Sequence, residues 1–177
     1  MLEMITSRQS DRRYDPRPVE QEKLERIIEA ARMSPSANNA QPWKFIVVTD
    51  PDLIQKIADA ASAKLLGMNS FVTQAPVQII IVREKTDIQT RAASVMKRRD
   101  YSLIDIGIAS ENICLQAEAE GLGSCMIGWF DERSVKKYLG IPGSKRVELI
   151  ITIGYSISNK KEKKRKPPEV TVSYNKY

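Results

Sequence analysis

Two short segments near the start of the chain hold residue types that can bind an anion or a polar ring. Arg8–Arg12 (RQSDR) places two arginines four residues apart, with a hydroxyl between them. Arginine donates planar, charge-assisted hydrogen bonds that suit phosphate, so both side chains can converge on one anion. Ser34–Trp43 (SPSANNAQPW) is rich in small and amide residues that can present hydrogen-bonding groups to a polar ring. The alternatives are two solvated arginines and an ordinary capped turn.

Two further segments lie nearer the other end. Gly121–Trp129 (GLGSCMIGW) contains three glycines, which let a backbone approach a ligand closely. The alternative is a tight connection between a helix and the next element. Residues 160–166 (KKEKKRK) hold six cations and one glutamate, and so carry +5 of the net charge of +6. Such a local cluster favours a phosphate or another anion over a surface that coats DNA, although a solvated tail is an equal alternative.

The chain contains no histidine, and its two cysteines, Cys114 and Cys125, lack the CxxC spacing of a metal or redox motif. These absences exclude Ser-His-Asp and Cys-His mechanisms and most zinc or non-haem iron sites. We therefore expect no metal. An enzyme of this composition must rely on carboxylates, lysine, tyrosine, backbone donors or a bound cofactor.

The length and the apolar pattern predict one domain over residues 1–177. The chain is 42% hydrophobic and 28% charged, which is enough for a core and for solubility. No apolar run has the length of a membrane span, and Met1–Tyr14 lacks the apolar core of a signal peptide. We therefore expect a cytoplasmic protein that neither binds a membrane nor coats nucleic acid.

The periodicity of apolar residues predicts a layered α+β architecture. The expected helices are Glu20–Met33, a helix that follows the Asp50-Pro51 cap, Asp100–Glu120 with Gly121 as its cap, and Glu132–Leu139. The expected strands are Trp43–Thr49, Val77–Arg83 and Val147–Tyr155. Val77–Arg83 is continuously apolar, as in a central strand covered on both faces. The stripe on Asp100–Glu120 is broad enough for burial on more than one side, where a partner subunit can supply the second wall.

Two other patterns limit the fold. No GxGxxG motif follows a strand, so a simple Rossmann fold is not expected. Pro167–Tyr177 contains two prolines and cannot form a helix interior, so we expect an extended arm.

Taken in order, these motifs resemble the nitroreductase family of FMN enzymes over essentially the whole chain. The matching features are Arg-x-Ser-x-Arg, Pro-Ser-x-x-Asn-x-Gln-Pro-Trp, Ala75-Pro76, Gly-Leu-Gly-Ser-Cys with Ile-Gly-Trp, Ile153-Gly154-Tyr155, and Lys-Arg-Lys-Pro before Tyr-Asn-Lys-Tyr. The resemblance implies a central, mostly antiparallel sheet flanked by helices. It also implies a homodimer in which the C-terminal arm wraps the partner and two FMN molecules lie at the interface.

The resemblance also assigns cofactor-binding roles by position. Arg8 and Ser10, with Gln9 between them, hold the FMN phosphate, and Arg12 lies by the N1/O2 edge of the flavin. From the other end of the chain, Lys163 and Arg165 return to the phosphate. The remaining expected contacts are Pro35, Ser36, Ala37 and Asn39 from the other subunit, Asn69 at the pyrimidine edge, and backbone contacts of Ile127 and Gly128 at N5 and O4. No side chain is expected to be catalytic.

The implied activity takes hydride from NADH or NADPH and reduces nitro or quinone acceptors by a ping-pong mechanism, which needs no histidine. The alternatives are an enone reductase, a dehalogenase, or a flavin-binding protein with little turnover. DNA binding through the basic tail is a further alternative, but it leaves Ser34–Trp43 unexplained. Lys97, Arg98 and Arg99 form a second basic cluster that can attract an anionic substrate or the NADPH phosphate. A solvated face is the alternative that the composition of this cluster favours.

Overall fold

The structure is a computed structural model that describes residues 1–62, 69–85, 96 and 98–177. Within these residues lies a four-stranded sheet of order β1-β2-β4-β3, and every neighbouring pair is antiparallel. The strands are β1 (Trp43–Val48), β2 (Val77–Arg83), β3 (Gly123–Ile127) and β4 (Arg146–Gly154). The three predicted strands are confirmed. The edge strand β3 falls in the glycine-containing segment and was not predicted as a strand.

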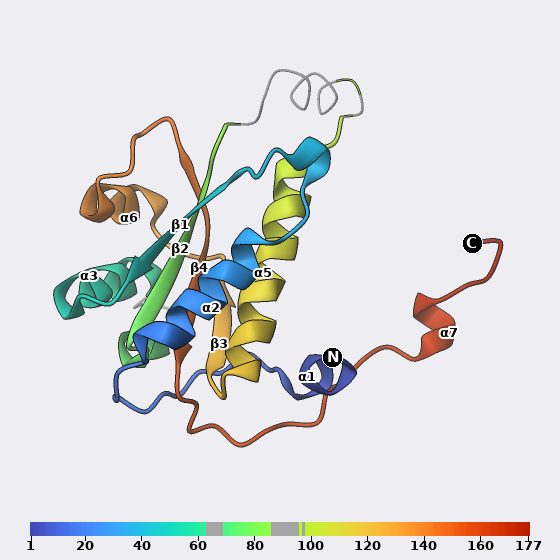
Figure 1. Ribbon diagram of the computed structural model, residues 1–177, viewed down its shortest axis with the longest axis horizontal. Coiled ribbons are helices and arrows are strands. Elements are labelled where there is room, and N and C mark those ends of the chain that lie inside the picture. Colours follow the sequence, from blue (N-terminus) through green and yellow to red (C-terminus); the bar gives the residue numbers. More distant parts are fainter. Residues whose placement is uncertain (63–68, 86–95, 97) are drawn as a thin grey trace.

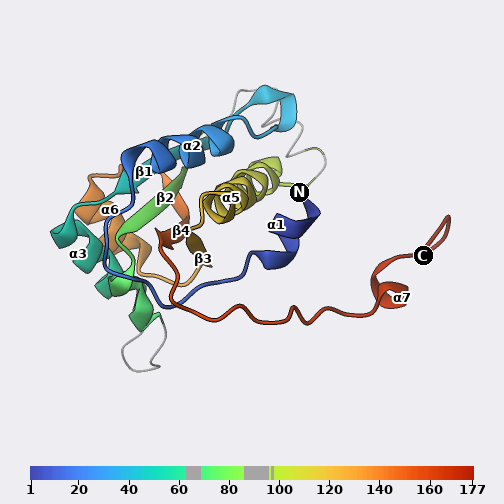
Figure 2. The same ribbon diagram turned by 60° about the horizontal axis from the view of Figure 1, so that its bottom comes forward.

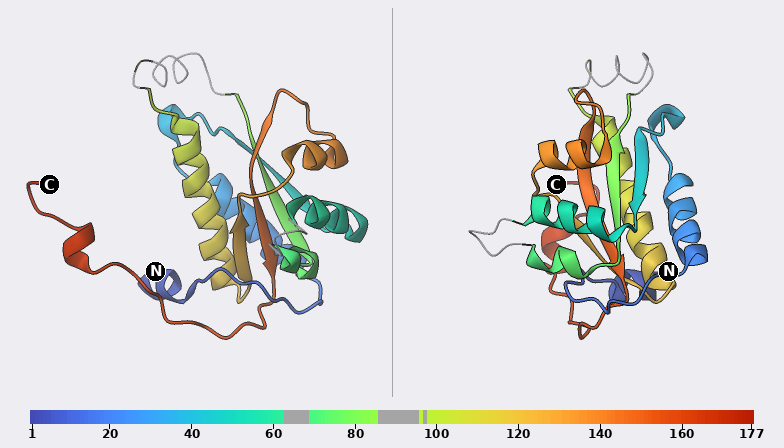
Figure 3. Two further views of the ribbon diagram at one scale, coloured as in Figure 1. Left: turned by 180° about the vertical axis from the view of Figure 1, so that it is seen from behind. Right: turned by 90° about the vertical axis from the view of Figure 1, so that its left-hand side faces the viewer.

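Helices cover both faces of this sheet. Their bounds are α1 (Leu2–Ser7), α2 (Gln21–Arg32), α3 (Pro51–Ala61), α5 (Tyr101–Ala119), α6 (Glu132–Leu139) and α7 (Pro168–Thr171), with short 3₁₀ segments η1 (Ala37–Asn39) and η3 (Ser70–Gln74). Figure 1 and the two views of Figure 3 show α2 and α5 together on one face and α3 and α6 on the other. The four longer predicted helices are therefore confirmed, in an α+β arrangement.

The central strand β2 has apolar side chains on both faces, as its unbroken apolar sequence predicts. Ile79 and Ile81 pack in the core formed with α2 and α5, whereas Ile80 and Val82 pack in the core formed with α3 and α6. All four side chains are at most 2% exposed. Full burial of each such side chain contributes roughly 1.5–3 kcal/mol, so β2 is a main source of the stability of the sheet.

The end of α5 directs the chain into β3. Gly121 adopts a left-handed conformation, with φ of 75°. Its N–H donates to the carbonyl of Glu118 (3.1 Å), and the Leu122 N–H donates to that of Ala117 (2.8 Å). This pair of hydrogen bonds is a Schellman motif, in which glycine avoids the penalty that a Cβ would bring. The predicted capping role of Gly121 is confirmed.

One face of α5 is left open in the single chain. Leu103 and Ile104 are 47% and 49% exposed, while Ile106 and Ile113 on the opposite side are buried against the sheet. Burial of this helix was predicted on more than one side. In the single chain, only the side that faces the sheet is buried. Within the described residues, none of the helices combines the length and the apolar character needed to cross a membrane.

The two ends of the chain run side by side beneath the sheet. Residues after α1 pass the start of β3, where the Asp11 N–H donates to the Ser124 carbonyl (2.9 Å). Further along, Tyr14 forms an isolated antiparallel β-bridge with Ser156, which follows β4. Beyond this point the C-terminal segment leaves the body of the protein (Figure 2). The predicted arm is extended except for α7, a helical turn that accommodates Pro168 because proline is tolerated at the first helical position.

Candidate functional site

The two ends of the chain enclose a basic cavity of 790 Å³. The structure brings together here the predicted site residues Arg8, Gln9, Ser10, Arg12, Lys163 and Arg165. Sequence reasoning had not assigned the remaining lining residues, which are Arg13, Ser158, Lys161, Glu162 and Lys164. Three of these lie in the basic run, which was the only signal for them in the sequence.

The cations in this cavity are crowded and incompletely neutralised. The Arg8 Nε is buried and has no hydrogen-bond partner among the described residues, although Glu111 Oε1 lies 3.5 Å away. The pKa of Lys163 is lowered, first by burial and then by the neighbouring charges of Arg8 and Arg165. Both effects disfavour a bare cluster of cations, and an anion that binds here relieves them. The donor set, with its planar guanidinium groups, suits a phosphate.

Two side chains pack closely against the backbone at the start of β3, next to the residues that line this cavity. An ideal Cβ built on Gly123 would lie 2.6 Å from Asp11 Oδ2 and 2.8 Å from the Cβ of Ser156. Only glycine fits at this point without displacing one of these segments. Gly123 therefore allows the N-terminal segment and the chain after β4 to pack together at the start of β3.

A second group of predicted residues meets at the far end of β3. The Asn69 side chain donates from Nδ2 to the carbonyls of Ala61 (3.1 Å) and Trp129 (3.2 Å). Asn69 thereby lies beside the end of β3, where the chain passes from Ile127 and Gly128 to Trp129. Its φ of 61° is left-handed, a conformation that asparagine tolerates better than most residues. Gly67 and Met68, which directly precede Asn69, lie outside the described residues.

Arg12 extends from the basic cavity toward this second group. Its Cζ lies 5.9 Å from the centre of the Phe71 ring, and Phe71 follows Asn69 closely in η3. The two groups of residues thus lie at opposite ends of β3. Four residue steps of a strand span roughly 13 Å. This arrangement suits an elongated ligand with an anionic group at one end and a polar ring at the other.

The loop Pro35–Gln41 lies apart from the cavity within the same chain. Figure 1 shows η1 beside the N-terminal end of α5, whereas α1 and the segment after it lie toward the other end. The loop residues that were predicted to contact the cofactor are Pro35, Ser36, Ala37 and Asn39. None of them lines the basic cavity. This separation agrees with the expectation that the loop serves the site of another subunit, which the single chain leaves untested.

Three residues of this loop adopt left-handed backbone conformations although none is glycine. The φ values are 52° for Asn38, 54° for Asn39 and 45° for Gln41. Hydrogen bonds hold this geometry: the Gln41 N–H donates to Ser36 Oγ (3.0 Å), and the Ala37 N–H donates to the buried Asp105 carboxylate (3.2 Å). The loop is therefore a pre-formed element, and Asp105 is a support that sequence reasoning missed.

The second basic cluster is only partly described. Lys97 lies outside the described residues, and Arg98 and Arg99 are exposed. Among the described residues, no contact assigns a function to these two arginines.

The nitroreductase family model matches this chain over two overlapping stretches, residues 5–67 and 63–155. The chain belongs to the nitroreductase family. The resemblance inferred from the ordered motifs is therefore confirmed. The matched stretches include the Arg8–Arg12 segment, the Ser34–Trp43 loop and β3, and end before the basic run.

Individual relatives match over most of their length. A solved FMN-dependent nitroreductase from Clostridium difficile is 30% identical, with a TM-score of 0.83 and coverage of 100% of both chains. An oxygen-insensitive NADPH nitroreductase from Helicobacter acinonychis is 28% identical over 203 residues, which cover 97% of this chain and 95% of the relative. An NADH dehydrogenase from Thermus thermophilus is 29% identical, covering 84% of this chain and 82% of the relative.

Proposed function

We propose that this protein is an FMN-dependent oxidoreductase that takes hydride from NADH or NADPH and reduces nitro or quinone-type acceptors by a ping-pong mechanism. The observation that carries the proposal is the basic cavity at the start of β3, combined with polar groups at the other end of the strand. The relatives that bear the names FMN-dependent nitroreductase, NADPH nitroreductase and NADH dehydrogenase support the same chemistry. When bound, FMN supplies a ring that accepts and gives up hydride equivalents.

The residues of the cavity fit the phosphate of FMN. The buried Arg8 Nε lacks a hydrogen-bond partner among the described residues, and burial together with the charges of Arg8 and Arg165 lowers the pKa of Lys163. Arg8, Ser10, Lys163 and Arg165 would hold the phosphate by charge-assisted hydrogen bonds. Arg12 would lie toward the ring, where its fixed charge stabilises negative charge that develops at the ring edge.

The far end of β3 would orient the ring. Ile127 is buried and Gly128 is exposed, so the backbone of this turn is fixed by the sheet and open to a ligand at its tip. Asn69 holds the following carbonyl of Trp129 in place. Backbone N–H groups donate hydrogen bonds without titrating, so hydride transfer would proceed without an acid or base from a side chain. No residue of the chain is assigned a catalytic role.

The functional unit would be a homodimer. The open face of α5 exposes Leu103, Ile104 and Ile108, which a second copy can cover. The arm carries further exposed apolar residues, including Val170 and Val172, which are 63% and 51% exposed. In this assembly, the arm would wrap the partner, and the Pro35–Asn39 loop would reach over the FMN of the other subunit.

A visible spectrum of the purified protein and an assay of NADH and NADPH oxidation test the proposal. We expect a yellow protein, or an apoprotein that takes up added FMN, and oxidation of a reduced nicotinamide that depends on a nitroaromatic or a quinone. A colourless protein that takes up no FMN contradicts the central claim. A flavin that is reduced but reoxidised by neither acceptor would instead favour an enone reductase, a dehalogenase or a flavin-binding protein with little turnover.

A further inference from the structure

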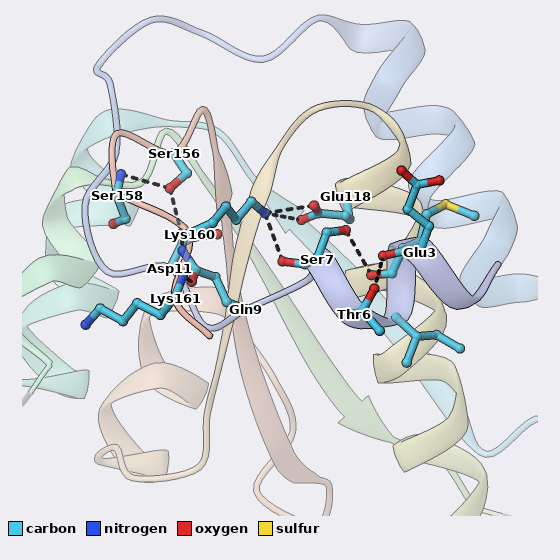
Figure 4. Close-up of polar contacts among 12 residues, drawn as sticks. Glu3, Thr6, Ser7, Gln9, Asp11, Glu118, Ser156, Ser158, Lys160 and Lys161 are labelled. Carbon is cyan, nitrogen blue, oxygen red and sulfur yellow. Dashed lines mark hydrogen bonds and ion pairs between the residues drawn. The ribbon is translucent and has the colours of Figure 1, made fainter. Parts of the chain in front are cut away.

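The Gln9 side chain lies on the wall of the basic cavity but has its polar atoms engaged within the protein. Its Nε2 donates to Asp11 Oδ1 (2.8 Å) and to the Asn159 carbonyl (3.1 Å), and its Oε1 accepts from the backbone N–H of Lys161 (3.0 Å). Both amide hydrogens and the amide oxygen are therefore used. Gln9 thus joins the N-terminal segment to the first residues of the basic run (Figure 4).

Asp11 makes a second connection between the same two segments. It is 1% exposed, and its Oδ1 accepts hydrogen bonds from Gln9 Nε2 (2.8 Å) and from Ser156 Oγ (2.7 Å). Ser156 Oγ in turn accepts from the backbone N–H of Ser158 (3.1 Å). One carboxylate oxygen therefore links the Arg8–Arg12 segment to the turn that leads from β4 into the basic run, as Figure 4 shows.

The burial of Asp11 is costly and needs a reason. A buried carboxylate is tolerated only where hydrogen bonds compensate for the lost hydration. Asp11 has this compensation at Oδ1 alone, since its Oδ2 has no hydrogen-bond partner among the described residues. An apolar residue would avoid the cost but would leave Gln9 and Ser156 without their common acceptor. The carboxylate is therefore best explained by the connection it makes.

Two lysines extend the contact toward α1. Lys160 Nζ donates to the Ser7 carbonyl (3.1 Å) and pairs with Glu118 Oε1 (2.7 Å), and Lys163 Nζ donates to the Ile5 carbonyl. Because Glu118 neutralises Lys160, that lysine acts as a structural contact. The cations left for a ligand from this segment are those nearer Arg165, which line the basic cavity.

We propose that Gln9 and Asp11 are positioning residues that hold the basic segment Lys161–Arg165 against Arg8–Arg12, and so form the phosphate cradle before the ligand arrives. This inference rests on the proposed function, because it assigns the cradle to the FMN phosphate. Neither side chain is required to touch the cofactor. Their contribution is to remove the cost of ordering long cationic side chains and their backbone at the moment of binding.

A comparison of FMN with riboflavin, which lacks the phosphate, tests the proposal on the whole chain. Dissociation constants for both flavins are measured on the apoprotein by quenching of flavin fluorescence. The variants are Gln9→Met, which keeps the length of the side chain but removes its polar atoms, and Ser156→Ala, which removes one hydrogen bond to Asp11. Gln21→Met is the matched control, because Gln21 bonds only Glu25 on an exposed face of α2 among the described contacts.

We expect Gln9→Met to weaken FMN binding by about tenfold, the effect of losing roughly one hydrogen bond to a charged group, and Ser156→Ala to weaken it less. Riboflavin binding should be unchanged in both variants, so the preference for FMN over riboflavin should fall. Gln21→Met should alter neither constant. A general loss of stability would weaken the binding of both flavins alike. The ratio of the two dissociation constants therefore separates a positioning role from an unspecific effect.

Two results would overturn the inference while leaving the proposed function intact. In the first, the wild type prefers FMN and Gln9→Met retains that preference within about twofold. In the second, FMN and riboflavin lose affinity equally in Gln9→Met. A wild type that binds neither flavin removes the proposed function, and the inference falls with it.

Discussion

The backbone N–H of Ala37 lies 3.2 Å from both carboxylate oxygens of Asp105. This contact joins the left-handed loop to the first half of α5. The carboxylate is only 4% exposed, and burial raises its pKa, although the hydrogen bond from Ala37 opposes this effect. The loop is therefore supported by the Asp105 carboxylate, whose charged form is disfavoured by burial.

Asp105→Asn should change how stability depends on pH. Since the pKa of Asp105 is raised in the folded state, that state holds the proton more tightly than the unfolded chain does. The contribution of Asp105 to stability is therefore largest below its unfolded pKa and is lost as pH rises through its folded pKa. We expect Asp105→Asn to gain stability relative to the wild type over this rise. Urea unfolding from pH 3.5 to 7.5 measures the difference, and a constant difference would contradict the expectation.

Arg8→Ala should weaken FMN binding. The Arg8 guanidinium lines the basic cavity, and its Nε lacks a hydrogen-bond partner among the described residues. Loss of one charged hydrogen bond to the phosphate costs about 1.5–3 kcal/mol. Calorimetric titration with FMN measures the change. Arg32→Ala is the matched control, because Arg32 is a half-exposed arginine paired with Glu29 on α2. Equal FMN affinity in both variants would refute the phosphate assignment.

Gly123→Ala should destabilise the fold at the start of β3. The added methyl group would meet Asp11 Oδ2 at 2.6 Å, in a region where both neighbouring segments are held by hydrogen bonds. Overpacking of this kind costs about 1–3 kcal/mol, which urea unfolding can resolve. Gly143→Ala provides the comparison, since nothing lies within 4 Å of an ideal Cβ there. If both variants unfold at the same urea concentration, the segments are less constrained than the structure indicates.

The paired substitution Ile104→Glu and Ile108→Glu should dissociate the proposed homodimer. Ile104 and Ile108 are 49% and 37% exposed on the open face of α5, so charges there should be tolerated in a monomer but not in a buried interface. Sedimentation velocity measures the change in mass. Tyr138→Glu on α6, where the side chain is 38% exposed, should leave the mass unchanged. A wild-type protein that sediments as a monomer would remove the homodimer from the proposal.

Arg26→Gln should remove a contribution to stability that is present at neutral pH and absent in acid. Arg26 donates two hydrogen bonds to Glu120, at 2.7 and 2.8 Å, and these lower the pKa of Glu120 to about 2. The contribution of Glu120 is therefore present above its unfolded pKa of 4.5 and lost as pH falls toward 2. Because Arg26 is half-exposed, solvent screens this ion pair, and we expect only a small loss of stability at pH 7. Thermal melts should show the two proteins converging at low pH, and a difference that persists there would contradict this assignment.

The sequence predicted the elements whose apolar pattern is strong and local. Val77–Arg83 and the α5 pattern led to a central strand and a long helix, which the structure confirms. The strand β3 was not predicted from the sequence, because Gly123, Ser124 and Cys125 have neither the branched nor the aromatic side chains that are typical of strands. That strand is formed by pairing with β4, a contact between distant parts of the chain.

The candidate site was predicted where its residues are adjacent in sequence, and missed where they act through distant partners. The arginines of Arg8–Arg12 and the basic run are visible as local clusters. Asp105 and Asp11 are not, because each looks like an ordinary charged residue until the fold buries it beside its partners. The contacts of Ala37 with Asp105 and of Ser156 with Asp11 arise only from tertiary packing.

The hydrogen bond between Gln9 and Lys161 joins residues separated by 152 positions. The four strands of the described sheet, however, are complete by Gly154, where β4 ends. A chain shortened directly after β4 would therefore keep every strand of this sheet and lose Lys161 and the other basic residues that line one side of the cavity. The core of the fold and one wall of the cavity are thus encoded by separate parts of the chain.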